Sequence, residues 1–438
     1  MAHSSQPADP AAPAPLSVGD EVELDVTNIA HGGVSVARHG GRVVFVADAI
    51  PGERVRARVT EARKKSFARA VTVEVIEASP DRRDHVWPEA ALDRAPQDRA
   101  GGAEFGHIAL PRQRDLKAQV LVDAMQRFGG LDVEELVGLE VEACLGDDES
   151  NGLGYRTRVR LHVDPETGAV GPYAARSRRV IPVLSLPLAT EGVEAIAPLG
   201  DSMPDVAAVD LVAPSADDPR MLLTVGDGRK RAGEDDPVRE LVGDRGFLVR
   251  AGGFWQVHRE APEVLFTAVR DAVTHLIDEG RFDAAAANLD LYGGAGLLAA
   301  AMAEAAGPQV KVTTVEADAG ATDDAAENLA ELVGARAITA RVDRYLADLL
   351  SAAPPVRDRL RRGTVVLDPP RSGAGGDVCA QLAGLAPANI VYVACDPVAL
   401  ARDTKTLLAA GYALAGLRAF DLFPHTHHLE SVALFTRE

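Results

Sequence analysis

Three patterns of apolar and polar positions follow one another along the chain of 438 residues. Between residues 17 and 78, apolar and polar residues alternate, as in Glu21–Val26 and Arg42–Val46, and glycine pairs separate the alternating runs. A period of two is typical of strands with one buried face, and glycine pairs favour tight turns. This stretch therefore predicts a small, OB-like β-barrel.

The middle of the chain has a less regular pattern. Residues 79–113 are rich in Arg, Asp, Pro and Gly, which predicts a linker, and a helix is predicted over Arg114–Arg127 before Gly129 and Gly130. From about residue 140 to residue 245 the alternation returns, as in Arg156–Val163. We therefore expect a mixed, mainly β middle domain over residues 114–245.

From residue 246 to residue 438 apolar runs of strand length alternate with helical segments. The runs are Ala287–Tyr292, Val310–Val315, Gly363–Asp368, Asn389–Cys395 and Ser431–Phe435. Continuous apolar strands between helices are typical of a doubly wound, Rossmann-like α/β domain. The predicted division is thus a disordered tail (1–16), a barrel (17–78), a linker (79–113), a middle domain (114–245) and an α/β domain (246–438).

The formal net charge of −19 disfavours nucleic-acid binding over most of the surface. The stretch from Arg54 to Arg69 nevertheless holds seven basic residues and one acidic residue. Alternation places one arginine set on a single strand face, opposite the apolar set. A basic face of this kind suits the phosphates of a nucleic acid, although a solvated charged face is an equal alternative. The residues predicted to contact such a backbone are Arg54, Arg56, Arg58, Lys64 and Lys65.

Cysteine usage and hydropathy exclude several classes of protein. The three cysteines are an odd, sparse set, which argues against a disulfide framework, and they form no Cys-x-x-Cys pair, which argues against a cysteine-based zinc or iron–sulfur site. No apolar run free of charge reaches the ~18 residues that a membrane span needs. The Ala/Pro/Ser-rich N-terminus lacks the apolar core of a signal peptide. We therefore expect a cytoplasmic protein without a membrane contact.

A glycine loop follows the first strand of the α/β domain, in the run Asp290–Gly296. Gly294 and Gly296 allow close approach of a ligand to the backbone. Glu316 follows 20 residues beyond Gly296, at the end of the next predicted strand, where a carboxylate accepts hydrogen bonds from ribose hydroxyls. Tyr292 stands where a dinucleotide site would have a glycine, which favours S-adenosylmethionine over NAD.

Two further strands each end in a reactive group. Asp368 precedes Pro369, Pro370 and Arg371, and Cys395 precedes Asp396 and Pro397. Each residue also has a purely structural interpretation: Asp368 as part of a turn, and Cys395 as a buried, unreactive thiol. A carboxylate, Glu430, and three histidines downstream favour a nucleophile with a nearby base. The histidines lack matching metal-ligand spacing, so no metal is predicted; they are His425, His427 and His428.

Together these motifs resemble those of the RNA uracil-C5 methyltransferase family, which carries an N-terminal TRAM domain. The resemblance covers the chain after residue 16 and is most specific in the last three motifs. The matching segments are Phe254–Val257, Asp290–Gly296, Asp368–Gly373, Ala394–Asp403 and Phe423–Glu430.

The resemblance implies a reaction and roles for individual residues. It implies Cys395 as the nucleophile that adds to C6 of uracil and Glu430 as the base that removes the C5 proton. S-adenosylmethionine is the implied cofactor and 5-methyluridine in structured RNA the implied product. The TRAM match favours 23S rRNA over tRNA, and we expect a monomer. The implied cofactor-site residues are Gln256, Tyr292, Glu316 and Asp368, beside Gly294 and Gly296 of the loop.

The chain departs from the family pattern at three places. Many relatives have a four-cysteine iron–sulfur site that the cysteine-free segment Gly101–His107 lacks, so no cluster is expected. Asp396 replaces the usual asparagine, with an expected effect on contacts to the uracil edge. Leu297 replaces a commonly polar residue of the cofactor loop. Two alternatives stay open: an RNA-binding or RNA-folding protein on the same scaffold, and an NAD-dependent oxidoreductase.

Overall fold

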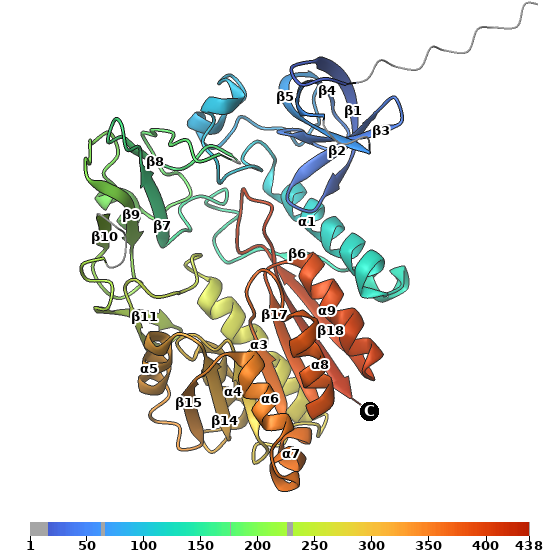
Figure 1. The fold of residues 1–438 in the computed structure, drawn as a ribbon, viewed down its shortest axis with the longest axis vertical. Helices are drawn as coiled ribbons and strands as arrows, with labels where there is room; N and C mark the ends of the chain where they lie inside the picture. Colours follow the sequence, from blue (N-terminus) through green and yellow to red (C-terminus); the bar gives the residue numbers. More distant parts are fainter. Residues whose placement is uncertain (1–15, 63–65, 176, 226–230, 438) are drawn as a thin grey trace, which may run out of the picture.

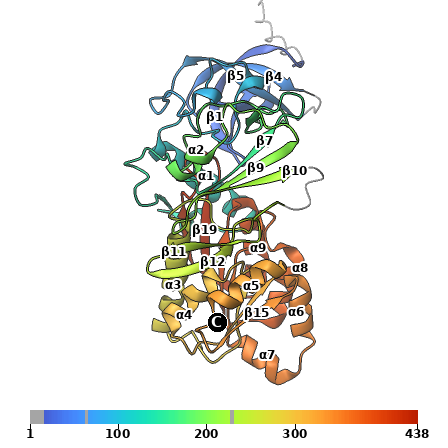
Figure 2. The ribbon, with the colours of Figure 1, turned by 90° about the vertical axis from the view of Figure 1, so that its left-hand side faces the viewer.

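The computed structural model describes residues 16–62, 66–175, 177–225 and 231–437. Figure 1 shows a barrel at one end of the molecule, an α/β sheet at the other, and a smaller sheet beside the barrel. The same order appears from the side in Figure 2. The predicted tail, apart from Leu16, and the predicted RNA contacts Lys64 and Lys65 lie outside the described residues.

Five strands form a closed barrel in the order β1-β2-β3-β5-β4. Alternate residues of β4, such as Val55 and Val59, point into the barrel core and are at most 1% exposed. The period-two pattern of the sequence therefore predicted the inward face correctly. The strands are β1 (Glu21–Ala30), β2 (Val34–His39), β3 (Arg42–Ala47), β4 (Arg54–Glu61) and β5 (Phe67–Glu77).

The segment after the barrel is irregular, as predicted, apart from the two short 3₁₀ helices Pro88–Ala90 and Pro96–Asp98. Buried ion pairs fasten it to the barrel: Arg82 pairs with Glu53, and Arg99 pairs with Asp48. The middle domain contains a four-stranded antiparallel sheet in the order β10-β9-β7-β8 and a hairpin. Its elements are β7 (Arg158–Val163), β8 (Val170–Gly171), α2 (Glu191–Ile196), β9 (Val206–Val212), β10 (Arg220–Val225), β11 (Pro237–Val242) and β12 (Arg245–Arg250).

The C-terminal domain has an eight-stranded sheet in the order β15-β14-β13-β16-β17-β19-β18-β6. Seven of the eight strands run in one direction, and β19 alone runs the opposite way, between β17 and β18. This arrangement confirms the predicted Rossmann-like α/β fold. The strands are β13 (Asn288–Leu291), β14 (Val312–Glu316), β15 (Ala335–Thr339), β16 (Thr364–Leu367), β17 (Asn389–Ala394), β18 (Tyr412–Phe420) and β19 (Glu430–Arg437).

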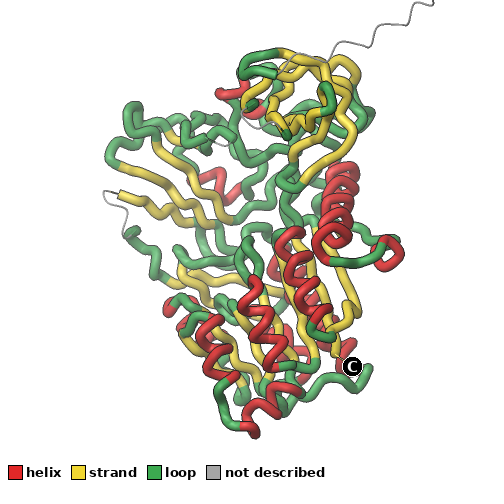
Figure 3. Tube along the Cα trace, turned by 45° about the vertical axis from the view of Figure 1, so that its right-hand side comes forward, coloured by secondary structure: helices red, strands yellow, loops and turns green. Residues whose placement is uncertain are grey.

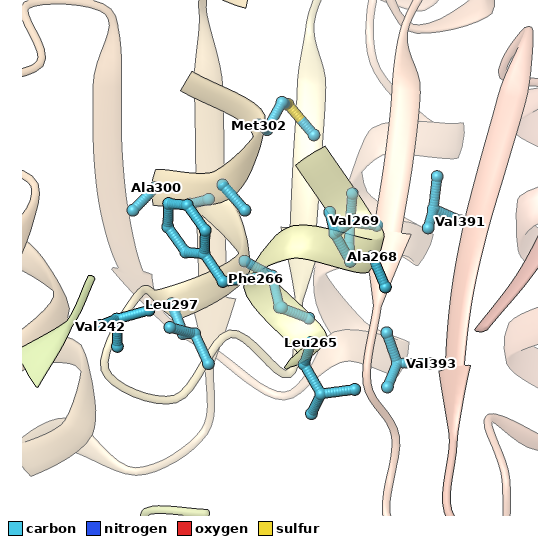
Figure 4. Packing of buried hydrophobic residues seen from close by; sticks show 14 of the residues in the cluster. Val242, Leu265, Phe266, Ala268, Val269, Leu297, Ala300, Met302, Val391 and Val393 are labelled. Carbon is cyan, nitrogen blue, oxygen red and sulfur yellow. The ribbon is translucent and has the colours of Figure 1, made fainter. Parts of the chain in front are cut away.

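Helices cover both faces of this sheet (Figure 3). On one face, α3 (Ala261–Asp278) and α4 (Leu297–Ala306) share a core with Val391 and Val393 of β17, and Figure 4 shows Leu265 and Val269 of α3 beside these two valines. The other face carries α6 (Val342–Leu350), α8 (Gly375–Leu385) and α9 (Pro397–Ala409). The remaining helices are α5 (Ala319–Asn328) and α7 (Pro354–Arg361). No helix in the described ranges is long and apolar enough to span a membrane.

The predicted boundary at residue 114 needs a correction. Helix α1 (Leu110–Ala124) starts four residues before the predicted helix, because Pro111 occupies its first turn. Strand β6 (Val141–Glu142) pairs with β18, at the edge of the C-terminal sheet. Leu121 and Val141 share the core of that sheet. The segment from α1 to β6 thus packs on the C-terminal domain and not on the middle sheet.

Candidate active site

The candidate residues gather at one edge of the C-terminal sheet because parallel strands all end there. Asp368 follows β16 and Cys395 follows β17, while Glu430 begins the antiparallel β19 and so reaches the same edge. A cavity of about 930 Å³ opens at this edge. Its lining includes seven predicted residues: Gln256, Tyr292, Gly294, Glu316, Asp368, Cys395 and Glu430.

The glycine loop is shaped to admit a ligand. Tyr292 has a φ of 61°, a left-handed conformation that is strained for a tyrosine and common at binding sites. A Cβ atom at Gly293 would lie 1.9 Å from the Thr314 hydroxyl, so the chain can turn there only as glycine. At Gly294 the same position is open space. The loop therefore presents bare backbone to the cavity.

Two further predicted cofactor-site residues, Glu316 at the end of β14 and Gly296 of the loop, have different roles. The Gly294 amide donates to Glu316 Oε2 over 3.3 Å, and amides of Ala317 and Asp318 donate to Oε1. These bonds fix the Glu316 carboxylate at the cavity wall. Gly296, by contrast, is buried at the start of α4 with a φ of 88° and does not line the cavity. We infer that it shapes the loop without touching a ligand.

Three carboxyl groups lie near one another and hold their protons unusually firmly. Burial raises the pKa of Asp290 to about 6, against the hydrogen bond from Thr314. Burial and the charge of Asp290 raise the pKa of Asp368 to about 7. Burial and the charge of Asp368 raise the pKa of Glu430 well above its ordinary value, against Arg371. A cation placed among them would favour their ionised forms.

The Cys395 thiol is half-buried at the cavity. Burial, with the charges of Glu430 and Asp368, raises its pKa to about 12, and Arg371 acts in the opposite direction. Arg402, which we expected to assist electrostatically, donates to the Val398 carbonyl of its own helix. The guanidinium that favours the thiolate is therefore that of Arg371.

Each of the three downstream histidines has a separate environment. His425 is buried and bonded to Gln113 and to the Asn151 carbonyl, which is a structural role. His427 Nδ1 pairs with Glu104 of the irregular segment, and only His428 lines the large cavity. Within the described ranges, two groups have donor atoms within 4.8 Å of one another and could hold a metal: Glu104, His427 and His428, and the buried Cys144, Asp147 and His258.

Asp396 does not line the large cavity. Its Oδ1 accepts hydrogen bonds from the Val398 and Ala399 amides and caps α9, while His31 of the barrel bonds to Oδ2 over 2.8 Å. Both oxygens thus have partners within the protein, and an effect of this residue on contacts to the uracil edge stays a prediction. A second cavity of about 190 Å³ lies beside the pair and also reaches Cys395.

The predicted basic face of β4 is largely neutralised by neighbouring strands. The predicted arginines project from the barrel, but each meets a glutamate of β1 or β5. The register between the strands, which cannot be read along the chain, creates these pairs. Their role in RNA binding stays a prediction. The pairs are Arg54–Glu23 (2.9 Å), Arg56–Glu74 and Arg58–Glu21 (2.9 Å).

Phe254 and Arg371 belong to motifs that the sequence displayed, but neither was assigned a role. Both line the large cavity, and Phe254 has 72% of its surface exposed. Arg156, one of six arginines in the basic stretch Tyr155–Arg179 that the sequence offers as a second phosphate-contact surface, lines the same cavity. An exposed aromatic ring and two guanidinium groups at a cavity mouth are typical of a nucleic-acid contact.

Comparison with known proteins adds two family matches. Residues 15–78 match the TRAM domain model, and residues 356–438 match the model of tRNA (uracil-5-)-methyltransferases. The TRAM match spans the barrel, and the second match spans the part of the sheet that carries Cys395 and Glu430.

Relatives align over nearly the whole chain. An RNA methyltransferase of Streptomyces coelicolor, itself uncharacterized, is 37% identical over 98% of this chain and 95% of its own. The 23S rRNA (uracil(1939)-C(5))-methyltransferase RlmD of Shewanella amazonensis is 31% identical over 95% of this chain and 96% of its own. The Pyrococcus abyssi tRNA (uracil-54, C5)-methyltransferase, solved with S-adenosyl-L-homocysteine, shares the fold with a TM-score of 0.66, at 19% identity, over 95% of this chain and 100% of its own.

Proposed function

This chain belongs to the RNA uracil-C5 methyltransferase family, and we propose that it methylates C5 of a uridine in 23S rRNA through a covalent bond to Cys395. The observation that carries the proposal is a single cavity whose wall holds a thiol, a buried carboxylate and a glycine loop. Nucleophile, base and cofactor site are thus within reach of one substrate base.

The cavity fits S-adenosylmethionine. Gly294 offers open space beside the backbone, Glu316 presents a fixed carboxylate for ribose hydroxyls, and Asp368 provides a carboxyl group for a cation. Gln256 and Tyr292 complete the wall. When bound, S-adenosylmethionine supplies an electrophilic methyl group on a positively charged sulfur. The group of carboxyls with raised pKa values suits that charge.

Cys395 makes C5 of uracil reactive. Its sulfur forms a bond to C6, and the electron pair of the C5–C6 double bond moves onto C5 and O4. C5 can then accept a methyl group. Burial raises the pKa of the resting thiol to about 12, so the thiol form dominates at neutral pH, and the positive charge of Arg371 favours the thiolate that reacts.

Glu430 completes the reaction as a proton acceptor. After methylation C5 still carries its hydrogen, which Glu430 removes as a proton while the C6–sulfur bond breaks and the C5–C6 double bond returns. A buried carboxylate is a stronger base than an exposed one, and the pKa of Glu430 is raised well above its ordinary value. Arg371 lies close enough to favour the ionised form.

The choice of 23S rRNA rests on the full-length relative that is named for it and on the TRAM domain. Transfer RNA is the second candidate, because the C-terminal family model and the Pyrococcus enzyme carry that name. Either substrate must unstack the target uridine to bring C6 to Cys395.

The test uses RNA from cells that lack this gene. Total RNA is incubated with the purified chain and methyl-labelled S-adenosylmethionine, and modified nucleotides are mapped by mass spectrometry. We expect 5-methyluridine at one position of 23S rRNA, absent with Cys395→Ala. Label in tRNA alone would overturn the rRNA assignment, and full activity of Cys395→Ala would overturn the covalent route.

A further inference from the structure

The barrel touches the helix that follows the proposed nucleophile at one turn. His31, in the turn between β1 and β2, has Nε2 2.8 Å from Oδ2 of Asp396, a residue 365 positions away. Gly33 of the same turn has a φ of 71°, and a Cβ atom there would lie 2.5 Å from Cβ of His427. The turn is therefore docked closely against the segment around His427 at Gly33, while His31 and Gly33 also line the cavity of about 190 Å³ beside Cys395.

Asp396 occupies a position where its charge matters. It directly follows Cys395, and its Oδ1 accepts from the Val398 amide at 3.0 Å and the Ala399 amide at 2.8 Å. Burial acts to raise the pKa of Asp396, but the hydrogen bonds from His31 and Ala399 outweigh it and hold that pKa below its usual range. A carboxylate so close opposes ionisation of the thiol.

We propose that His31 is a positioning residue for methyl transfer: by pairing with Asp396 it offsets the negative charge beside Cys395 and fixes the start of α9. The proposal rests on the proposed role of Cys395. The barrel would thus contribute a residue to the catalytic centre, because without His31 the charge of Asp396 beside the Cys395 thiol has no positive partner.

The charges around His31 support this assignment. The hydrogen bond to Asp396 raises the pKa of His31, against burial and the charge of Arg402, which lies on the same helix as the capped turn. His427, Arg371 and Lys117 line the cavity beside the pair. Asp396 is the one acidic residue among the described residues that line this cavity, so it is the natural partner for an imidazolium.

The pair also explains how this chain accommodates its unusual aspartate. An asparagine at position 396 would cap α9 through the same oxygen without a charge. Aspartate and a protonated His31 together are also neutral. Replacing Asp396 by asparagine should therefore make His31 dispensable, whereas replacing His31 alone should lower the reactivity of Cys395.

The experiment compares four full-length variants with the wild type: His31→Ala, Asp396→Asn, the double variant, and His39→Ala as a matched control on β2 of the same barrel. Alkylation of Cys395 by iodoacetamide is followed from pH 6 to pH 9 by peptide mass spectrometry, with the buried Cys144 and Cys379 as internal unreactive references. Values of kcat and of KM for RNA are measured in parallel.

We expect His31→Ala to slow alkylation at neutral pH by about threefold to tenfold, equivalent to a rise of up to about one unit in the pKa of the thiol. We expect kcat to fall and KM for RNA to change by less than about twofold. Asp396→Asn and the double variant should react alike, and His39→Ala should match the wild type. If His31→Ala does not fold, His31→Gln, which keeps a donor without the charge, should show the same direction.

Unchanged alkylation in His31→Ala, or a double variant as slow as His31→Ala, would overturn the proposal. So would a rise in KM alone, because His31 would then be an RNA contact. Alkylation reports on the pair even without methyl transfer. If the variants follow the expected order but no enzyme methylates RNA, the proposed function fails while the pairing stands.

Discussion

Cofactor binding should depend on pH because Asp368 holds a proton in the cofactor cavity. With a pKa of about 7, about one-tenth of this group is ionised at pH 6 and about nine-tenths at pH 8. If the cationic cofactor binds the ionised form, its affinity should rise about tenfold over this range. S-adenosylhomocysteine, which lacks the charge on sulfur, should show a smaller rise.

Without cofactor, the free energy of unfolding should instead fall as the pH rises. An unfolded aspartate has a pKa of about 3.9, so the stability from this raised pKa is fully present below about pH 4 and is lost as the pH rises to about 7. If stability falls with rising pH while cofactor affinity rises, both effects are explained by one buried carboxyl group.

Isothermal titration calorimetry at pH 6, 7 and 8 measures this effect, and buffers of different ionisation enthalpy report the protons released on binding. Asp368→Asn should bind more weakly at pH 8 and lose most of the slope. Equal affinity of the wild type at pH 6 and pH 8, without proton release, would refute the reasoning.

Three further predictions concern the anchoring of the catalytic loop, the base and the RNA surface. Lys117→Met should destabilise the protein by about 3–5 kcal/mol in urea unfolding, because it leaves the carboxylate of Asp421 buried without its partner; both side chains of this pair are 1% exposed. The double variant with Asp421→Leu should recover most of this loss. Equal destabilisation of the single and double variants would contradict the prediction. Glu430→Gln should accumulate a protein–RNA adduct visible on denaturing gels, because the C5 proton cannot leave; rapid turnover without adduct would assign the base elsewhere. Arg371→Gln should lower the slope of log K for RNA binding against log salt concentration by about 1. Arg56→Gln removes a guanidinium that is already paired with Glu74 and should leave this slope unchanged. The opposite result would identify the arginine face of β4 as the RNA contact.

The sequence predicted what depends on local pattern. Strands β16 and β17 are buried on both faces and end sharply, so their apolar runs located Asp368 and Cys395 at the sheet edge. The closed barrel also followed from alternation. Strand β6 has only two residues, and its pairing with β18 depends on tertiary packing that no local signal reveals.

Contacts between distant segments could not be predicted. The pairing of Arg54 with Glu23 depends on strand register, and the pairing of His31 with Asp396 depends on how the barrel docks. The sequence did show Asp396 as unusual, but it could not show the partner of this carboxylate, because His31 lies in another domain. Departures from a family motif are therefore best interpreted together with their three-dimensional partners.

The covalent role of Cys395 is the central claim, and trapping with 5-fluorouridine in the target RNA tests it most directly. Fluorine at C5 cannot leave as a proton would, so an enzyme that adds a thiolate to C6 stays bonded to the RNA after methylation. We predict, with S-adenosylmethionine present, a stable adduct that peptide mass spectrometry maps to Cys395. Formation of 5-methyluridine in normal RNA without any such adduct, or an adduct at another residue, would contradict the account.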